Sequence, residues 1–106
     1  MDEENNRKKL ELEVSQNMKW DDVNDVWNKV ALFFKENDKI EEVKLSVDGV
    51  SNIDSLSLNY LVMLRGFAME RGGDFVLTDV NDALYRVFEM MQLNRKFTII
   101  RKEGEE

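Results

Sequence analysis

The sequence predicts one α/β domain of two layers, in which a mostly parallel mixed sheet carries helices on one face. Three observations support this fold class. Strand-like and helix-like segments alternate three times along the 106 residues, an order that forces crossover connections and a largely parallel sheet. Two of the strand-like segments alternate apolar and polar residues, which indicates one covered and one open sheet face. Glycines and short polar stretches, with no proline, separate the segments.

The first strand and the first helix differ in hydrophobic period. From Leu10 the sequence KLELEV places Leu10, Leu12 and Val14 on one side, which is the period of a half-buried strand. The helix that follows ends near Asn37, and its apolar residues recur at helical spacing: Trp20, Val23, Trp27, Val30 and Phe34. We interpret both tryptophans as core residues.

Three aspartates, Asp21, Asp22 and Asp25, occupy the first turns of this helix. Calcium ligation would require oxygens at alternate positions and a glycine for the sharp turn. This segment has no glycine, so we interpret the aspartates as charges that compensate the helix dipole.

A second strand and a second helix follow. EEVKLSVDGV alternates, with Val43, Leu45 and Val47 facing one way, and Gly49 predicts a turn. The second helix is expected to begin at Asp54 or Ser55 and to run to Arg71. The pair Gly72-Gly73 would then end it, because glycine readily adopts the left-handed conformation past a last turn.

The C-terminal third repeats the pattern. FVLTDV, residues 75–80, predicts a third strand, and Asn81 or Asp82 caps a third helix. The predicted buried stripe of that helix consists of Leu84, Val87, Phe88 and Met91. A short last strand would contain Phe97, Ile99 and Ile100. The domain is thus expected to span residues 10–100, with polar tails at 1–9 and 101–106.

Composition excludes several classes of function. A net charge of −7 argues against a nucleic-acid partner, which requires a basic surface. The absence of cysteine and histidine removes thiolate chemistry, imidazole-bound metals and the usual base of nucleophilic triads. We therefore expect no cofactor, no metal and no catalytic activity. No signal peptide or membrane span is visible, so we expect a cytoplasmic protein without membrane insertion.

Asp54 and Ser55 stand where the second strand leads into an apolar helix. One interpretation is an ordinary cap, in which a side-chain oxygen accepts from free backbone amides. The other is a phosphorylation switch at Ser55, because amides and the helix dipole tolerate the added charge of about −1.5 to −2. Local spacing alone favours the cap.

The second helix is apolar on two sides. Leu58, Leu61, Leu64 and Ala68 form the expected core stripe, and a second strip on nearly the opposite side consists of Leu56, Tyr60, Met63 and Phe67. A neighbouring helix of the same chain could cover this strip, or a partner could bind it. Self-association into a homodimer through the same strip is a further alternative.

Residues 43–97 resemble the STAS domain, the fold of bacterial anti-sigma factor antagonists. The resemblance rests on VKLSVDGVSNIDSLSL, on Gly72-Gly73, on FVLTDVND and on LYRVFEMMQLNRKF. It covers about half of the chain strongly, and the segment from Leu10 to Asn37 fits more loosely. By resemblance Ser55 matches the serine that an anti-sigma kinase phosphorylates, with Asp54 before it. Leu56 and Ser57 depart from the family pattern, which commonly has Ser or Thr and then Gly.

The resemblance implies a non-catalytic regulatory module. Its unmodified form would bind a serine kinase or anti-sigma factor and thereby free a sigma factor for transcription, and phosphorylation of Ser55 would weaken that contact. The implied partner-binding residues are Asp54, Ser55, Leu56, Ser57, Asn59, Tyr60 and Met63. The main alternative is an accessory subunit that docks through the same helix on the ATPase of a lipid-trafficking ABC transporter. A third alternative is an enzyme that acts through carboxylates alone. The sequence shows no second carboxylate that would be expected to lie close to Asp54.

Overall fold

A computed structural model describes residues 9–14 and 20–102, and of Trp20 it describes only the backbone. In chain order the elements are β1 (Lys9–Glu13), α1 (Trp20–Glu36), β2 (Glu42–Ser46), α2 (Ser55–Glu70), β3 (Asp74–Val80), α3 (Asp82–Met90) and β4 (Thr98–Arg101). The predicted alternation of strands and helices is confirmed. Two sequence-based expectations, the polar tail before Lys9 and the core position of the Trp20 side chain, lie outside the described residues.

The strands form one sheet in the order β1-β2-β3-β4, and every neighbouring pair is parallel. Leu12 pairs with Leu45, which pairs with Leu77, so one row of apolar side chains crosses three strands. The α/β fold with a parallel sheet is therefore confirmed. The described strands include no antiparallel pair, so the mixed character that we expected is not seen in this part of the chain.

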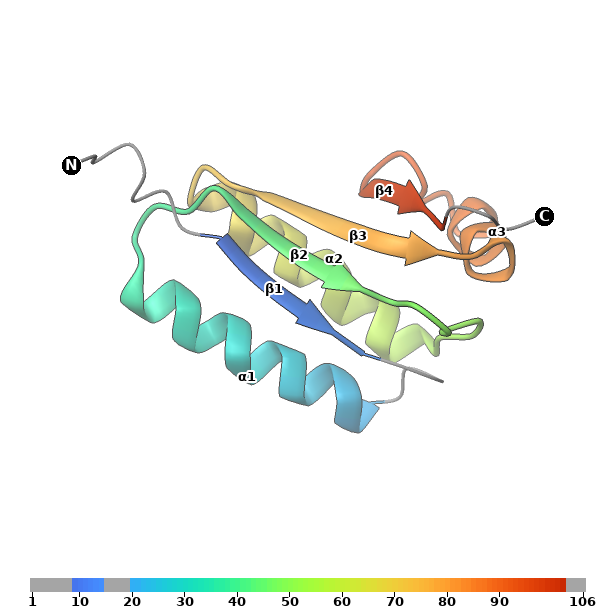
Figure 1. The fold of residues 1–106 in the computed structure, drawn as a ribbon, viewed down its shortest axis with the longest axis horizontal. Helices are drawn as coiled ribbons and strands as arrows, with labels where there is room; N and C mark the ends of the chain where they lie inside the picture. The colour runs from blue at the N-terminus through green and yellow to red at the C-terminus, as the bar shows by residue number, and fades with distance from the viewer. Residues whose placement is uncertain (1–8, 15–19, 103–106) are drawn as a thin grey trace.

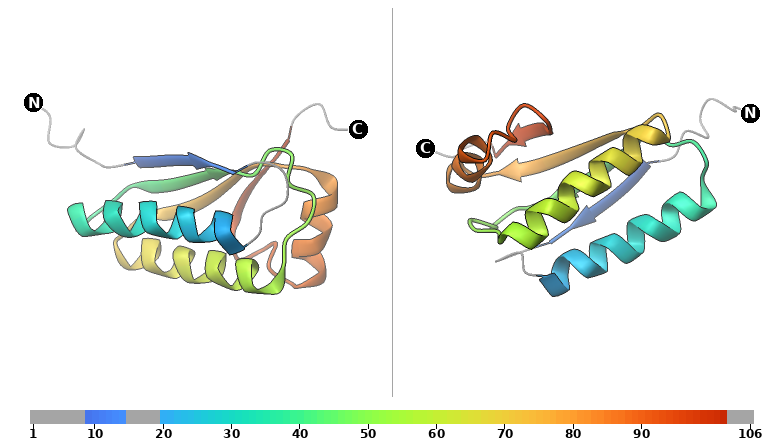
Figure 2. Two further views of the ribbon diagram at one scale, coloured as in Figure 1. Left: turned by 90° about the horizontal axis from the view of Figure 1, so that it is seen from below. Right: turned by 180° about the vertical axis from the view of Figure 1, so that it is seen from behind.

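The two long helices cover one face of the sheet (Figures 1 and 2). α1 lies beside β1, α2 lies beneath β2 and β3, and the two helices run side by side. α3 lies beyond the end of β3, close to β4 (Figure 1). The opposite sheet face carries polar residues such as Glu11 and Lys44, as the alternating pattern of these two strands predicts.

The core lies between the sheet and these helices. Its largest fully buried side chains are Phe75, Phe88, Leu45, Leu61, Leu64, Leu77 and Leu84. Burying one such side chain contributes about 1.5–3 kcal/mol. This layer fixes α2 against β3, and α2 carries most of the predicted site residues.

Glycine ends α2 as the sequence predicts. Gly72 has a φ of 80°, and its amide donates to the Met69 carbonyl while the Gly73 amide donates to the Ala68 carbonyl. These bonds satisfy carbonyls that the helix leaves unpaired. A Cβ at Gly73 would lie 2.5 Å from the side chain of Ile40, so the second glycine allows close packing.

The predicted stripe of α3 is wrong at one position. Met91 is 52% exposed, because the helix ends at Met90 and the chain turns through Gln92, whose φ is 60°. The Leu93 amide then donates to the Phe88 carbonyl at 2.7 Å. Sequence periodicity continued the stripe past this turn, where the helical spacing no longer applies.

The last strand extends past the predicted domain end. Arg101 belongs to β4 and pairs with Val80, and the amide of Lys102 donates to the Val80 carbonyl at 2.9 Å. The placement of residues 101 and 102 in a frayed tail is therefore wrong. A bulge precedes this pairing, where Asp79 has a φ of 60° and accepts a 2.7 Å hydrogen bond from the Ser46 hydroxyl.

Candidate protein-binding site

Asp54 caps α2. Its backbone is extended, its carboxylate accepts from the Ser57 amide at 2.7 Å, and its carbonyl accepts from the Leu58 amide at 3.0 Å. Ser55 is therefore the first residue of the helix proper. Of the two capping residues that the sequence allowed, the structure selects the aspartate, which leaves the Ser55 hydroxyl without a capping role.

The capping bond lowers the pKa of the Asp54 carboxyl below its usual value of 3.8. The main cause is the hydrogen bond from the backbone amide of Ser57, which favours the charged form. The Ser57 hydroxyl contributes less, because it makes no hydrogen bond to any described residue.

This shift predicts an acid-dependent loss of stability. Since the pKa in the folded chain lies below that in the unfolded chain, the cap stabilises the fold above pH 3.8, and the stabilisation disappears as the pH falls through the folded-state pKa. Asp54→Asn retains an N-cap acceptor and should flatten this part of the stability profile. Urea unfolding measured between neutral and acidic pH checks the expectation, and identical pH profiles for the two proteins would contradict it.

Ser55 is exposed on the first turn of α2. The neighbouring Asp54 carboxylate is also exposed, and the first turn contains no other acidic residue. A phosphate on Ser55 would lie near the positive end of the helix dipole, which reduces the cost of the added charge. It would also add negative charge next to Asp54, so that the surface changes while the fold remains.

The remaining predicted contact residues divide into exposed and buried ones. Leu56 is 50% exposed and Met63 40% exposed, and Asn59 lies exposed between them. Ser57 is 0% exposed, so its predicted role in binding is wrong. The reason is its position on the core stripe, one helical turn before Leu61.

α1 covers part of the second apolar strip of α2. The ring of Trp27 makes edge contacts with Tyr60 and Phe67, at centroid distances of 5.3 Å and 5.7 Å. Both of these rings are only partly exposed. The two interpretations of the strip therefore apply to different parts of it: a neighbouring helix covers Tyr60 and Phe67, whereas Leu56 and Met63 stay open. We call Ser55, Leu56, Asn59 and Met63 the α2 face.

The loop that leads into α2 is tied to the C-terminal part of the fold. The Asn81 side chain donates to the Val50 carbonyl at 3.2 Å, and the Lys102 ammonium group lies 2.6 Å from the Asp48 carboxylate. Asn81 also caps α3 by accepting from the Leu84 amide at 2.9 Å. These contacts join the loop before α2 to the start of α3 and to the residue after β4.

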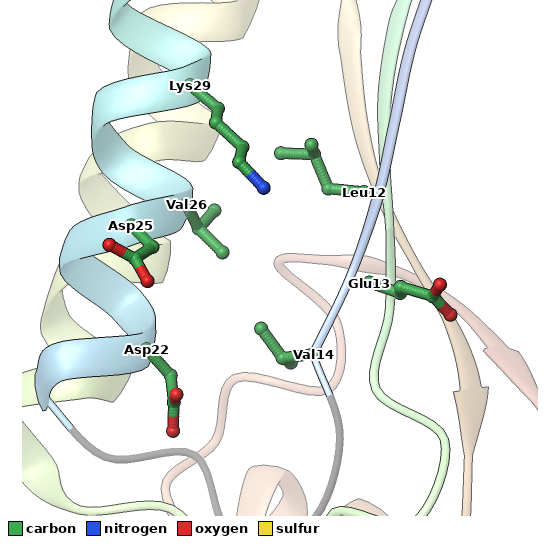
Figure 3. Close-up of a pocket in the computed structure, with 7 residues that line it drawn as sticks. All are labelled: Leu12, Glu13, Val14, Asp22, Asp25, Val26 and Lys29. Atoms are coloured by element: carbon green, nitrogen blue, oxygen red, sulfur yellow. The ribbon is translucent and has the colours of Figure 1, made fainter.

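The described residues also line hollows outside the α2 face, two of which lie against α1. One, of about 410 Å³, lies between β1 and α1, where Lys29 points toward Leu12, and Asp22 and Asp25 line the helix side (Figure 3). The other, of about 360 Å³, lies between α1 and α2 beside Trp27 and Phe67. No group of three or more acidic residues in the described parts of the chain is arranged to hold a metal ion.

A family model described as "Mlab, STAS domain" matches residues 1–101. The chain is a STAS domain. This membership supports a regulatory or binding module in general, and the parallel sheet with its three helices agrees with the STAS fold. Comparisons with curated proteins and with solved structures gave no match. Among the helices that the structure describes in this STAS domain, none is long and apolar enough to cross a membrane.

Proposed function

We propose that this STAS domain is a non-catalytic regulatory module that binds a partner protein through the α2 face. The observation that carries the proposal is the exposure of Leu56 and Met63 at 50% and 40%, on one side of a helix that Asp54 caps. Methionine is one of the residue types enriched in protein interfaces, whose centres are more apolar than the rest of the surface. In the primary form of the proposal, the partner is a serine kinase or anti-sigma factor.

Phosphorylation of Ser55 would act as the switch of this contact. The exposed hydroxyl lies one residue before Leu56 in the sequence, so a phosphate would introduce charge and bound water into an apolar contact. Asp54 adds repulsion toward an acidic partner. Burial of Ser57 makes it a poor substrate, which leaves Ser55 and the exposed Ser51 as the accessible serines of residues 51–57.

Incubation with ATP and the candidate kinase is expected to place phosphate on Ser55, and Ser55→Asp should weaken partner binding at least tenfold. The physical reason is the cost of burying an unpaired charge in the interface. Mass spectrometry locates the phosphate, and titration calorimetry measures the affinity. Ser51→Asp is the matched control, since it adds the same charge outside α2. Modification of Ser51 alone, or an unchanged affinity for Ser55→Asp, would contradict the switch.

A second candidate partner is the ATPase of an ABC transporter that traffics lipids. The 50% exposure of Leu56 favours it. Leu56 also stands where phosphorylated antagonists commonly have a small or polar residue, which suits a constitutive apolar contact. Binding to the ATPase that is lost in Leu56→Asp, unaffected by kinase treatment, would select this candidate over the first.

A further inference from the structure

The end of α3 forms an exposed apolar corner. Met90 is 81% exposed and Met91 is 52% exposed, and the chain turns back immediately afterwards through Gln92. The Leu93 amide bonds to the Phe88 carbonyl, so the turn is fixed to the helix. Both methionines therefore lie at the exposed C-terminal end of α3, which we call the corner, and α3 itself lies beyond the end of β3 (Figure 1).

Three exposed cations flank this corner. Arg86 lies one helical turn before Met90 on the same side of α3, and Arg95 and Lys96 lie in the turn that follows. None of the three forms an ion pair with another described residue, since the ion pairs found in this part of the chain involve other cations.

The other nearby cations are already engaged. Arg101 pairs with Asp82 and lies 4.0 Å from the centre of the Tyr85 ring, and Lys102 pairs with Asp48. Glu89 is the single acidic residue between Arg86 and Lys96. The flanking cations are thus free to attract an anionic surface, although cations near a helix end also favour the helix dipole.

Charge is separated along the chain. Residues 83–102 contain five Lys or Arg against one Glu, whereas residues 1–82 contain 18 acidic against 10 basic residues, and residues 103–106 add three glutamates. Such asymmetry is a sign of contact with an anionic surface.

We propose that this corner, formed by Arg86, Met90, Met91, Arg95 and Lys96, binds the surface of a membrane that contains anionic lipids. Cations attract the headgroups, and the exposed methionines enter the boundary between headgroups and acyl chains. A nucleic acid would use the cations but gain nothing from the methionines. A protein partner would gain from the methionines as well, and the charge difference between the segments of the chain is what favours an anionic membrane surface.

The expected binding is weak and reversible. Each cation near an anionic surface strengthens binding about fivefold, so three contribute about a hundredfold. The contact requires no spanning helix, in accord with the helices of the described residues. It is separate from the α2 face and does not depend on the proposed protein partner.

Co-sedimentation of the full chain with lipid vesicles tests the proposal. The protein should bind vesicles in which about a third of the lipid is phosphatidylglycerol, should not bind pure phosphatidylcholine, and should be released by salt. Arg95→Gln with Lys96→Gln should weaken binding about thirtyfold, and Met90→Ser should weaken it severalfold. Deleting residues 103–106 removes three glutamates and should strengthen it.

Matched controls lie on and just after α1. Lys35→Gln with Lys39→Gln removes the same charge from exposed positions, and Leu32→Ser removes an apolar side chain that is 56% exposed; both should bind like the unmodified chain. Leu56→Asp should do so as well, which separates this proposal from the protein-binding one. Absence of binding to anionic vesicles at low salt would overturn the proposal. So would equal losses in the control variants, or corner variants that lose affinity only for an acidic protein.

Discussion

Leu56→Asp combined with Met63→Glu is expected to abolish binding of the partner protein, with a loss of at least a hundredfold in affinity. The two side chains are i and i+7 neighbours on α2 and lie 50% and 40% exposed, so each new carboxylate would enter the centre of the contact. Burying an unpaired charge costs several kcal/mol. Titration calorimetry with each candidate partner, the serine kinase, the anti-sigma factor or the transporter ATPase, measures the loss.

Matched exposed residues provide the control for this experiment. Met69 is 52% exposed on α2 and Leu32 is 56% exposed on α1, and neither belongs to the α2 face. Met69→Glu with Leu32→Asp should retain the affinity of the unmodified chain. Both double variants should also unfold at the same urea concentration, because all four positions are exposed. Equal binding losses in the two double variants would remove the α2 face from the proposed function.

Phe88→Ala is expected to lower the free energy of unfolding by about 3–5 kcal/mol. The ring is 0% exposed and stacks on Phe97 at a centroid distance of 5.7 Å. Phe97 in turn lies 6.1 Å from Phe75, so one aromatic row joins α3 to the β3–β4 part of the sheet. Removal of the Phe88 ring, at the α3 end of this row, leaves a cavity in the core.

Urea unfolding monitored by circular dichroism measures this change, with Val87→Ala as the control. Val87 is the preceding residue of α3 and is only partly buried, so its truncation should destabilise the domain by about 1 kcal/mol or less. A Phe88→Ala variant as stable as Val87→Ala would show that α3 contributes little to the folded core. Hydrogen exchange in β4 should rise in Phe88→Ala before exchange in β2 does.

The strands and helices could be predicted from the sequence, but which of their side chains a neighbouring element covers could not. The hydrophobic period and the capping residues predicted the described strands and helices, including the end of α2 at Gly72-Gly73, because these signals are local in the sequence. The division of the apolar strip was not predictable, since Trp27 covers Tyr60 and Phe67 only once α1 lies beside α2. Ser57 was misplaced for a different reason. The family resemblance placed Ser57 in the contact, whereas its angular position, shared with Leu61 and Leu64, already indicated the core.

The end of α3 shows that helical periodicity alone does not predict the residue at which a helix ends. Met91 fits the buried stripe by spacing, but Gln92 adopts a left-handed conformation and ends the helix one residue earlier. No glycine or proline marks this stop. The same turn produces the exposed corner, so the largest error in the predicted core coincides with the surface that the charge distribution singles out.

Strand order has a consequence for synthesis on the ribosome. Each strand pairs with the next one along the chain, and the paired residues lie roughly thirty positions apart or fewer. Nascent β-α-β units could therefore assemble one after another as the polypeptide emerges. One further contact must wait for Lys102, whose ammonium group pairs with Asp48 in the loop before α2 and whose amide donates to the Val80 carbonyl at the end of β3. A ribosome stalled before that codon would hold a chain in which the loop before α2 lacks this contact.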